Sequence, residues 1–333
     1  MAIWIETKSF IDNILEITAL KSKILLTENN LLTLANRHPE LEELASFINN
    51  KNRSIRIYPD EYNQYFLDVR KAIGNIPDNR DAHHIMATIT KKLLNDKQDV
   101  EAAQKVIKKL IEVNAVNDPM KIVEYSIKYR ANVETVLSLL DMLGEMQNRS
   151  VFLDPMIGIQ NVEWDGIKKL DLLFSAELLP KNDLIYFDQE FINYLKENLD
   201  DITSIHWRNF ERLVAEFFNK IGYTVALGLG QSDGGIDIRI FNTKNIEKGP
   251  PLIIVQCKRY NDNNLVDVNT VKAFYSDMLN EQAEIGLIAT TSRIAPIGKD
   301  TIKARAYNIQ LAEKNDIGEM ITAMWRNHYK SEI

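Results

Sequence analysis

The sequence predicts a mostly α-helical N-terminal domain followed by a C-terminal domain of α/β or α+β arrangement, in which helices cover a sheet. The chain has 333 residues, more than the roughly 100–200 of a usual single domain. Apolar residues recur at helical spacing in the first part, for example in SFIDNILEITALKSKILL and VEAAQKVIKKLIEV. From Trp207 onward a helical run, WRNFERLVAEFFNKIG, precedes short β-rich runs: YTVALGL, GIDIRIF, PLIIVQCKRY and EIGLIATT.

The domain limits follow from where the helical pattern stops. Residues 1–150 are expected to form the helical domain, whose open roles are recognition, sensing and oligomerisation. The segment NRSVFLDPMIGIQ, residues 148–160, breaks the pattern with a proline, a glycine and β-branched residues. Residues 151–200 are therefore expected to connect the helical domain to a C-terminal domain over 201–333.

Composition restricts the class of protein. Hydrophobic residues make up 45% and charged residues 26%, the balance of a soluble globular protein. The chain contains neither a secretory signal pattern nor a run of about 18 apolar residues, so we expect a cytoplasmic protein without a membrane span. The lone Cys257 excludes an internal disulfide and a zinc site made of several cysteines.

The net charge of −7 first argues against a nucleic-acid partner, because phosphates call for a basic surface. The charge is unevenly distributed. Residues 201–333 contain 16 Lys+Arg and 16 Asp+Glu, which leaves 24 against 31 in residues 1–200, so the acidic excess lies wholly in the first part. A neutral C-terminal domain neither requires nor excludes DNA binding.

Two β-rich runs carry polar side chains of the kinds that bind metals or take part in catalysis. In DGGIDIRI the isoleucines alternate with Asp237 and Arg239, and in LIIVQCKRY Gln256 and Lys258 lie on the face opposite Cys257. If the two strands are neighbours, a carboxylate, an amide oxygen and an ammonium converge. Either strand alone also fits an ordinary core strand, but burying an unpaired lysine in a core is costly.

Such a cluster suits phosphodiester hydrolysis with a hard divalent cation, which prefers oxygen ligands. Asp237 would be the principal metal ligand, and Gln256 would lend its carbonyl oxygen. Lys258 would hold the attacking water or offset charge on the phosphate. On the helix that begins at Trp207, Glu211 lies at the edge of the apolar stripe and can reach inward, whereas Glu216 points away.

The C-terminal part contains several blocks in a fixed order: HWRNFERLVAEFFNKIGY, SDGGIDIRI, IIVQCKRY, VKAFYSDM, GLIATTSRI and KARAYNIQLAE. Together they resemble the Mrr-like type IV restriction endonuclease domain, a branch of the PD-(D/E)xK nuclease superfamily. The resemblance runs from about His206 to Trp325. It implies a mixed sheet flanked by helices, catalysis with Mg²⁺ or Mn²⁺, and hydrolysis of DNA, in restriction or anti-phage defence.

Particular residues match the family motif. Asp237, Gln256 and Lys258 take the positions of the catalytic motif, and Glu211 takes that of the acidic residue in the first helix. Asp237, Gln256 and Glu211 are thus the expected metal ligands. Gln256 replaces the usual carboxylate, which members of this branch tolerate.

Other functions remain open at this point. The neutral Gln256 and the absence of a basic charge excess also suit a nuclease-derived module that binds DNA or a protein without cutting. RNA is a further substrate class, since no residue distinguishes the 2′-hydroxyl. We expect a homo-oligomer, because cutting two strands suits two active sites, and restraint by a partner protein or by DNA modification.

Weaker signals have competing explanations. Hydroxyls at the end of GLIATTS and the cations after them could contact phosphates, although a solvated helix face explains the lysines equally well. These residues are Thr290, Thr291, Ser292, Arg293, Lys299, Lys303 and Arg305. Lys258 and Arg259 are the stronger phosphate candidates. Cys257 is interpreted as a core residue, and His83, His84 and Asp233 as surface, core or turn residues.

Overall fold

The computed structural model describes residues 2–75, 96–116, 118–140, 143, 166–180, 182, 184–228, 230, 235–242 and 249–331. The expected boundary at 148–160 and the residues His83, His84 and Asp233 lie outside these ranges. The chain forms two compact units. One comprises residues 1–58, 64–75 and 164–333, and the other residues 59–63 and 76–163. This grouping places the first 58 residues in the same unit as the C-terminal sheet, whereas the division into 1–150, 151–200 and 201–333 stays a prediction.

The N-terminal part of the first unit is a small helical layer with a short strand pair. Its helices are α1 (Thr7–Ser22), α2 (Glu28–Arg37), α3 (Glu42–Asn49) and, from residue 64 onward, α4 (Pro59–Ala72). The Phe10 ring makes edge contacts with Phe47 and Tyr65, at centroid distances of 5.9 and 5.6 Å. Strand β1 (Ile3–Glu6) pairs antiparallel with β3 (Ser54–Ile57), a feature that helical periodicity does not predict.

The second unit buries an apolar cluster between helices. Helices α6 (Lys97–Glu112) and α7 (Pro119–Tyr129) and the helical residues 133–140 surround it. The buried members are Val100, Ala103, Val106, Ile107, Leu110, Ile122, Tyr125, Val136 and Leu139. The charged residues of α6 lie outside this cluster, so the helix is amphipathic as its sequence predicts.

The described part of residues 164–203 belongs to the first unit and overlaps the predicted connecting segment 151–200. It contains β4 (Lys168–Lys169), α10 (Leu172–Ser175), α11 (Gln189–Glu197) and the 3₁₀ turn η3 (Leu199–Thr203). Strand β4 pairs with β2 (Ile24–Leu25), and Nδ2 of the Asn198 side chain donates to the Ala72 carbonyl at 2.7 Å. These contacts attach the segment to the N-terminal helices.

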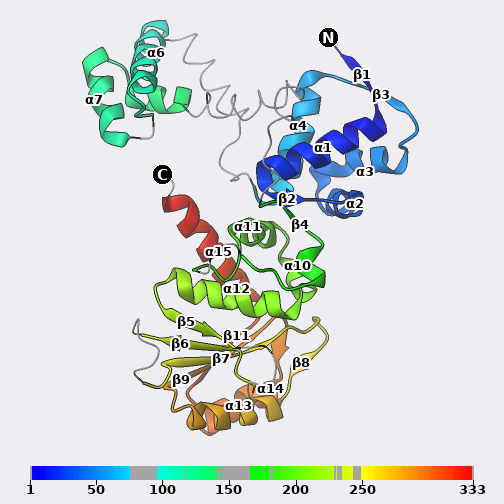
Figure 1. The fold of residues 1–333 in the computed structure, drawn as a ribbon, viewed down its shortest axis with the longest axis vertical. Helices are drawn as coiled ribbons and strands as arrows, with labels where there is room; N and C mark the ends of the chain where they lie inside the picture. Colours follow the sequence, from blue (N-terminus) through cyan, green and yellow to red (C-terminus); the bar gives the residue numbers. More distant parts are fainter. Residues whose placement is uncertain are drawn as a thin grey trace. The chain divides into compact units, whose positions relative to one another are not determined.

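A five-stranded mixed sheet forms the centre of the C-terminal part, with the strand order β11-β9-β7-β6-β5 (Figure 1). The strands are β5 (Thr224–Leu227), β6 (Ile238–Phe241), β7 (Ile253–Lys258), β9 (Ile285–Thr290) and β11 (Ile309–Ala312). Strands β5, β6 and β7 are antiparallel neighbours, while β7, β9 and β11 run parallel. The predicted fold class, a mixed sheet preceded by a mostly helical part, is confirmed.

Helices cover both faces of the sheet (Figure 1). Helix α12 (Trp207–Lys220) packs on β5, β6 and β7, and α13 (Val268–Asn280) packs with α14 (Pro296–Ala304) on the opposite face. Helix α15 (Lys314–Ser331) packs against α11 and α12. Gly286 lets α13 approach β9, because a Cβ there would lie 2.9 Å from the Phe274 ring. Within the described ranges, the helices are all too short or too polar to cross a membrane.

Candidate active site

The Asp237 carboxylate lies against strand β7. Asp237 directly precedes β6, and its amide donates to the Val255 carbonyl at 2.9 Å. The Cys257 amide in turn donates to Asp237 Oδ2 at 2.6 Å. The two polar strands are therefore neighbours, which is the condition that the sequence argument required, and the Asp237 carboxylate lies beside the Cys257 amide.

The Gln256 side chain is buried, and of its two polar atoms only the nitrogen has a hydrogen-bond partner among the described residues. It is 7% exposed, and its Nε2 donates to the Gly235 carbonyl at 2.9 Å. Gly235 has a φ of +87°, and a Cβ there would lie 3.1 Å from that nitrogen, so a glycine suits the position. Among the described residues, Gln256 Oε1 has no hydrogen-bond partner. A buried unpaired acceptor is costly, which favours a cation or a water at this oxygen.

Lys258 ends strand β7, opposite Thr290 on β9. Its carbonyl accepts a hydrogen bond from Thr290 Oγ1 at 2.8 Å. The side chain is half-buried, and strand alternation gives it the same face as Gln256.

Glu211 is buried on α12 beside a buried arginine. Glu211 is 5% and Arg208 8% exposed, and Arg208 Nη1 lies 2.6 Å from Glu211 Oε2. Arg208 also contacts Glu177 at 3.2 Å and donates from Nη2 to the Gly228 carbonyl at 2.5 Å. Because the Gly228 amide donates to the Asp237 carbonyl at 2.8 Å, Arg208 links Glu211 to the backbone of Asp237.

The pKa of the Cys257 thiol is affected by four charged side chains. Burial raises its pKa well above the usual value, the Asp237 and Glu211 carboxylates raise it further, and the cations of Lys258 and Arg208 oppose that rise. All four charged groups therefore lie near one thiol. A raised thiol pKa disfavours the nucleophilic thiolate, as expected from the sequence. The residue is half-buried and its thiol lies near charged groups, however, so Cys257 is not the apolar core residue that strand alternation predicts.

Comparison with known families identifies this part of the chain. Residues 202–321 match the family model Mrr_cat, described as a restriction endonuclease. These residues form a Mrr-type restriction endonuclease domain. The match confirms the resemblance between His206 and Trp325. No curated protein matches the chain.

Two solved structures show a more distant likeness. The MspJI restriction endonuclease in complex with a 27-mer oligonucleotide is 15% identical, with 52% of this chain and 39% of that chain covered and a TM-score of 0.32. The DNA modification-dependent restriction endonuclease AspBHI is 16% identical, with 54% and 48% covered and a TM-score of 0.31. The chain spans less than half of the length of either protein.

The donor set of the Mrr domain fits a hard divalent cation. The described residues contain no group of three or more His, Cys, Asp or Glu side chains placed to hold a metal. A metal beside β7 would thus need the Gln256 amide oxygen in addition to the Asp237 and Glu211 carboxylates. Mg²⁺ and Mn²⁺ accept such oxygen ligands, and the unpaired Gln256 Oε1 supplies one.

The hydroxyls at the end of β9 are not surface phosphate contacts, so that expectation is wrong. Thr290, Thr291 and Ser292 are 0%, 0% and 1% exposed, and their hydroxyls donate to backbone carbonyls. Of the cations that follow, Lys299 pairs with Glu313 at 2.8 Å. The exposed cations Arg293, Lys303 and Arg305 and the half-buried Arg259 stay candidates for phosphate contact.

Helix α12 is buried on more sides than its apolar stripe indicates. Glu216, which the sequence predicts to point away from the apolar stripe, is 2% exposed and accepts from the Tyr186 amide at 2.7 Å. Burial raises the pKa of this carboxyl. Arg208 is the site residue that sequence reasoning missed. Its position three residues before Glu211, where helical side chains meet, was the available signal.

Proposed function

We propose that the Mrr domain is a metal-dependent DNA endonuclease that hydrolyses phosphodiester bonds in restriction or anti-phage defence. The observation that carries the proposal is the unpaired, buried Gln256 Oε1 on β7, directly before Cys257, whose amide binds the Asp237 carboxylate, with Lys258 two residues after Gln256. Asp237, Gln256 and Glu211 would hold Mg²⁺ or Mn²⁺. A bound divalent cation polarises the phosphate and lowers the pKa of a coordinated water.

The protein's own groups have distinct roles in this proposal. Asp237 is fixed by the Cys257 amide through Oδ2, so one carboxylate oxygen has a set direction. The Lys258 ammonium would orient the attacking water or stabilise negative charge on the phosphate. Arg208 would hold Glu211 in place through the 2.6 Å contact.

Cleavage of plasmid DNA tests the proposal. Purified protein should nick or cut the plasmid with Mg²⁺ or Mn²⁺ and stop when EDTA is added. Asp237→Ala and Lys258→Ala should each lower the rate by at least about 10²-fold, the scale for losing one group that stabilises transition-state charge. Lys272→Ala, at an exposed position on α13, is the matched control and should cut normally. Undiminished cleavage by both site variants would reject the assignment.

Calorimetry with Mn²⁺ tests the metal ligands without relying on turnover. Asp237→Ala should abolish binding, whereas Gln256→Glu should tighten it, because a carboxylate binds a hard cation more strongly than an amide does. Asp300→Ala, on α14, is the control for loss of one carboxylate elsewhere. Equal affinities in wild type and Gln256→Glu would remove Gln256 from the ligand set.

The alternative is a nuclease-fold module that binds DNA or a protein without cutting. Two observations favour it: Arg208 already neutralises Glu211, and the Cys257 amide already occupies Asp237 Oδ2. Absence of Mn²⁺ binding even with DNA present would support the module. The same assays run with RNA of the same sequence decide between the two nucleic acids.

We further propose a cytoplasmic homo-oligomer in which residues 1–150 supply recognition, sensing or subunit contacts. A freely active nuclease would damage its host's DNA, so restraint by DNA modification, assembly or a regulatory partner protein belongs to this proposal. Sedimentation of the full chain with and without DNA measures the oligomeric state directly.

A further inference from the structure

The pairing of β7 with β9 is interrupted directly after Lys258. The parallel register ends at Lys258 opposite Thr290. It resumes where β8 (Leu265–Val266) pairs with β10 (Arg293–Ile294). Between these points residues 259–264 lie opposite only residues 291–292, so the chain after Lys258 makes an excursion out of the sheet.

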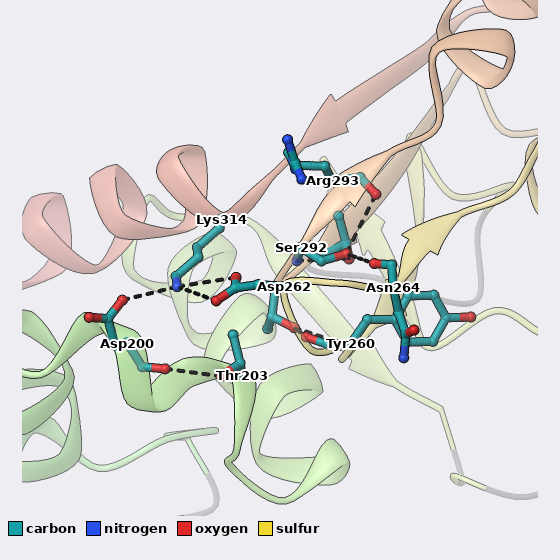
Figure 2. A network of polar contacts seen from close by, with 10 residues as sticks. Asp200, Thr203, Tyr260, Asp262, Asn264, Ser292, Arg293 and Lys314 are labelled. Atoms are coloured by element: carbon teal, nitrogen blue, oxygen red, sulfur yellow. Dashed lines mark hydrogen bonds and ion pairs between the residues drawn. The ribbon is translucent and has the colours of Figure 1, made fainter.

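Three hydroxyls replace the missing strand pairing at the base of this excursion. Thr290 Oγ1 donates to the Lys258 carbonyl at 2.8 Å. Thr291 Oγ1 donates to the Tyr260 carbonyl at 2.7 Å and accepts from the Tyr260 amide at 2.8 Å. Ser292 Oγ donates to the Asn264 carbonyl at 2.6 Å (Figure 2). Both ends of the excursion are thereby tied to β9.

These hydrogen bonds are inside the protein, while the outer part of the excursion is held by charge. The three hydroxyl residues are at most 1% exposed, so water does not compete for their partners. Farther out, the Lys314 ammonium lies 3.0 Å from Asp200 and 3.3 Å from Asp262 (Figure 2). Asp262 is 65% exposed, and exposed ion pairs contribute little, so the buried hydroxyls are the main restraint.

We propose that Thr290 and Thr291 are positioning residues for Lys258, an inference that rests on the proposed nuclease function. Their hydroxyls fix the backbone from Lys258 to Tyr260 and thereby set where the Lys258 ammonium meets the reacting phosphate. Neither hydroxyl touches the substrate. A displacement of about 1 Å at a reacting group can cost about 10²-fold in rate, so this backbone restraint acts on catalysis.

Thr→Val substitution removes each hydroxyl while keeping the side-chain volume. Thr290→Val and Thr291→Val should lower kcat at least about tenfold. The KM for DNA and the Kd for Mn²⁺ should change less than about twofold, because the proposed metal ligands are untouched. Thr290→Ser and Thr291→Ser keep the hydroxyl and should restore kcat. Thr301→Val is the control, since Thr301 Oγ1 donates within its own helix, to the Ile297 carbonyl.

Amide hydrogen exchange over residues 258–264 provides a readout that is independent of cleavage. Thr291→Val should accelerate exchange at the Tyr260 amide, which has lost its acceptor, and Thr301→Val should not. If amide exchange over residues 258–264 is unchanged in both Thr290→Val and Thr291→Val, the positioning inference is wrong, whatever the cleavage rate of these variants. If exchange rises in these two variants while their kcat equals that of the wild type, the hydroxyls are merely structural and the inference also fails.

The two proposals fail in different ways. A wild type that binds DNA but cleaves nothing with Mg²⁺ or Mn²⁺ rejects the nuclease function, and the dependent inference with it, whereas the exchange data still decide whether the hydroxyls restrain the excursion. If Thr291→Val does not fold, Thr290→Val, which removes a single side-chain donor to the Lys258 carbonyl, decides the outcome alone.

Discussion

Helices α12 and α6 both pack against a core, but they bury different kinds of side chain. Helix α6 buries only apolar side chains, such as Val106 and Leu110, and leaves its charges outside. Helix α12 buries Arg208, Glu211 and Glu216 as well as its apolar stripe. Removing charges from water costs free energy that an ion pair only partly returns. The buried charges of α12 therefore indicate a role beyond holding the fold, whereas α6 is built for packing.

The largest effect is expected when one partner of the Arg208–Glu211 ion pair on α12 is replaced. Arg208→Met leaves the Glu211 carboxylate buried without its counter-charge, so the free energy of unfolding should fall by about 3–5 kcal/mol. Urea unfolding followed by fluorescence of the neighbouring Trp207 measures this. Arg305→Met, at an exposed position, should stay within about 0.5 kcal/mol of the wild type.

A double variant sharpens the same comparison. Replacing both partners with apolar residues, in Arg208→Met with Glu211→Leu, should recover most of the lost stability. The double variant should not cleave DNA, because it lacks Glu211, a proposed metal ligand. Recovery of stability together with activity would show that the pair has no function and that α12 and α6 differ only in composition.

The next effect belongs to the apolar core of α6. Leu110→Ala removes a fully buried side chain and should destabilise the second unit by about 2–5 kcal/mol through lost burial and a residual cavity. The adjacent Ile111, 59% exposed, provides the matched control, and Ile111→Ala should change stability little. Hydrogen exchange of α6 amides reports the local stability of this unit. Similar losses in the two variants would contradict the assigned burial.

A weaker, pH-dependent effect is expected at Glu216, whose carboxyl can accept hydrogen bonds in either protonation state. Burial raises its pKa in the folded protein, so the folded state binds the proton more tightly than the unfolded state. Its contribution to stability is therefore largest at low pH. It is lost as pH rises from about 4.3, the unfolded value, through the raised folded pKa. Urea midpoints of wild type and Glu216→Gln should diverge over that window, with the variant less sensitive to pH.

Local periodicity predicts the elements of the C-terminal part and the faces on which Gln256 and Lys258 lie, because both depend on residues close in sequence. That β6 and β7 are neighbours was only a condition of the sequence argument, and the structure supplies it. Local periodicity does not predict the β1–β3 pair, whose partners lie far apart along the chain. The burial of Glu216 escapes it too, since residues near Tyr186 cover the outer side of α12. The burial of Thr290 and Thr291, which the sequence offers as possible phosphate contacts, escapes it for the same reason. Their exposure is decided by the excursion after Lys258, which a single strand's pattern does not contain.

The smallest effect tests whether the second unit depends on helix ends as well as on its core. Asp118 precedes α7, and its carboxylate accepts from the Met120 and Lys121 amides at 3.0 and 3.2 Å. Asp118→Ala leaves both amides without that acceptor and should cost about 0.5–1 kcal/mol. Asp118→Asn keeps an acceptor oxygen and should cost less. Exchange at the Met120 and Lys121 amides measures the difference. Equal exchange in the alanine and asparagine variants would mean that packing at Ile122 and Tyr125, rather than the cap, fixes where α7 begins.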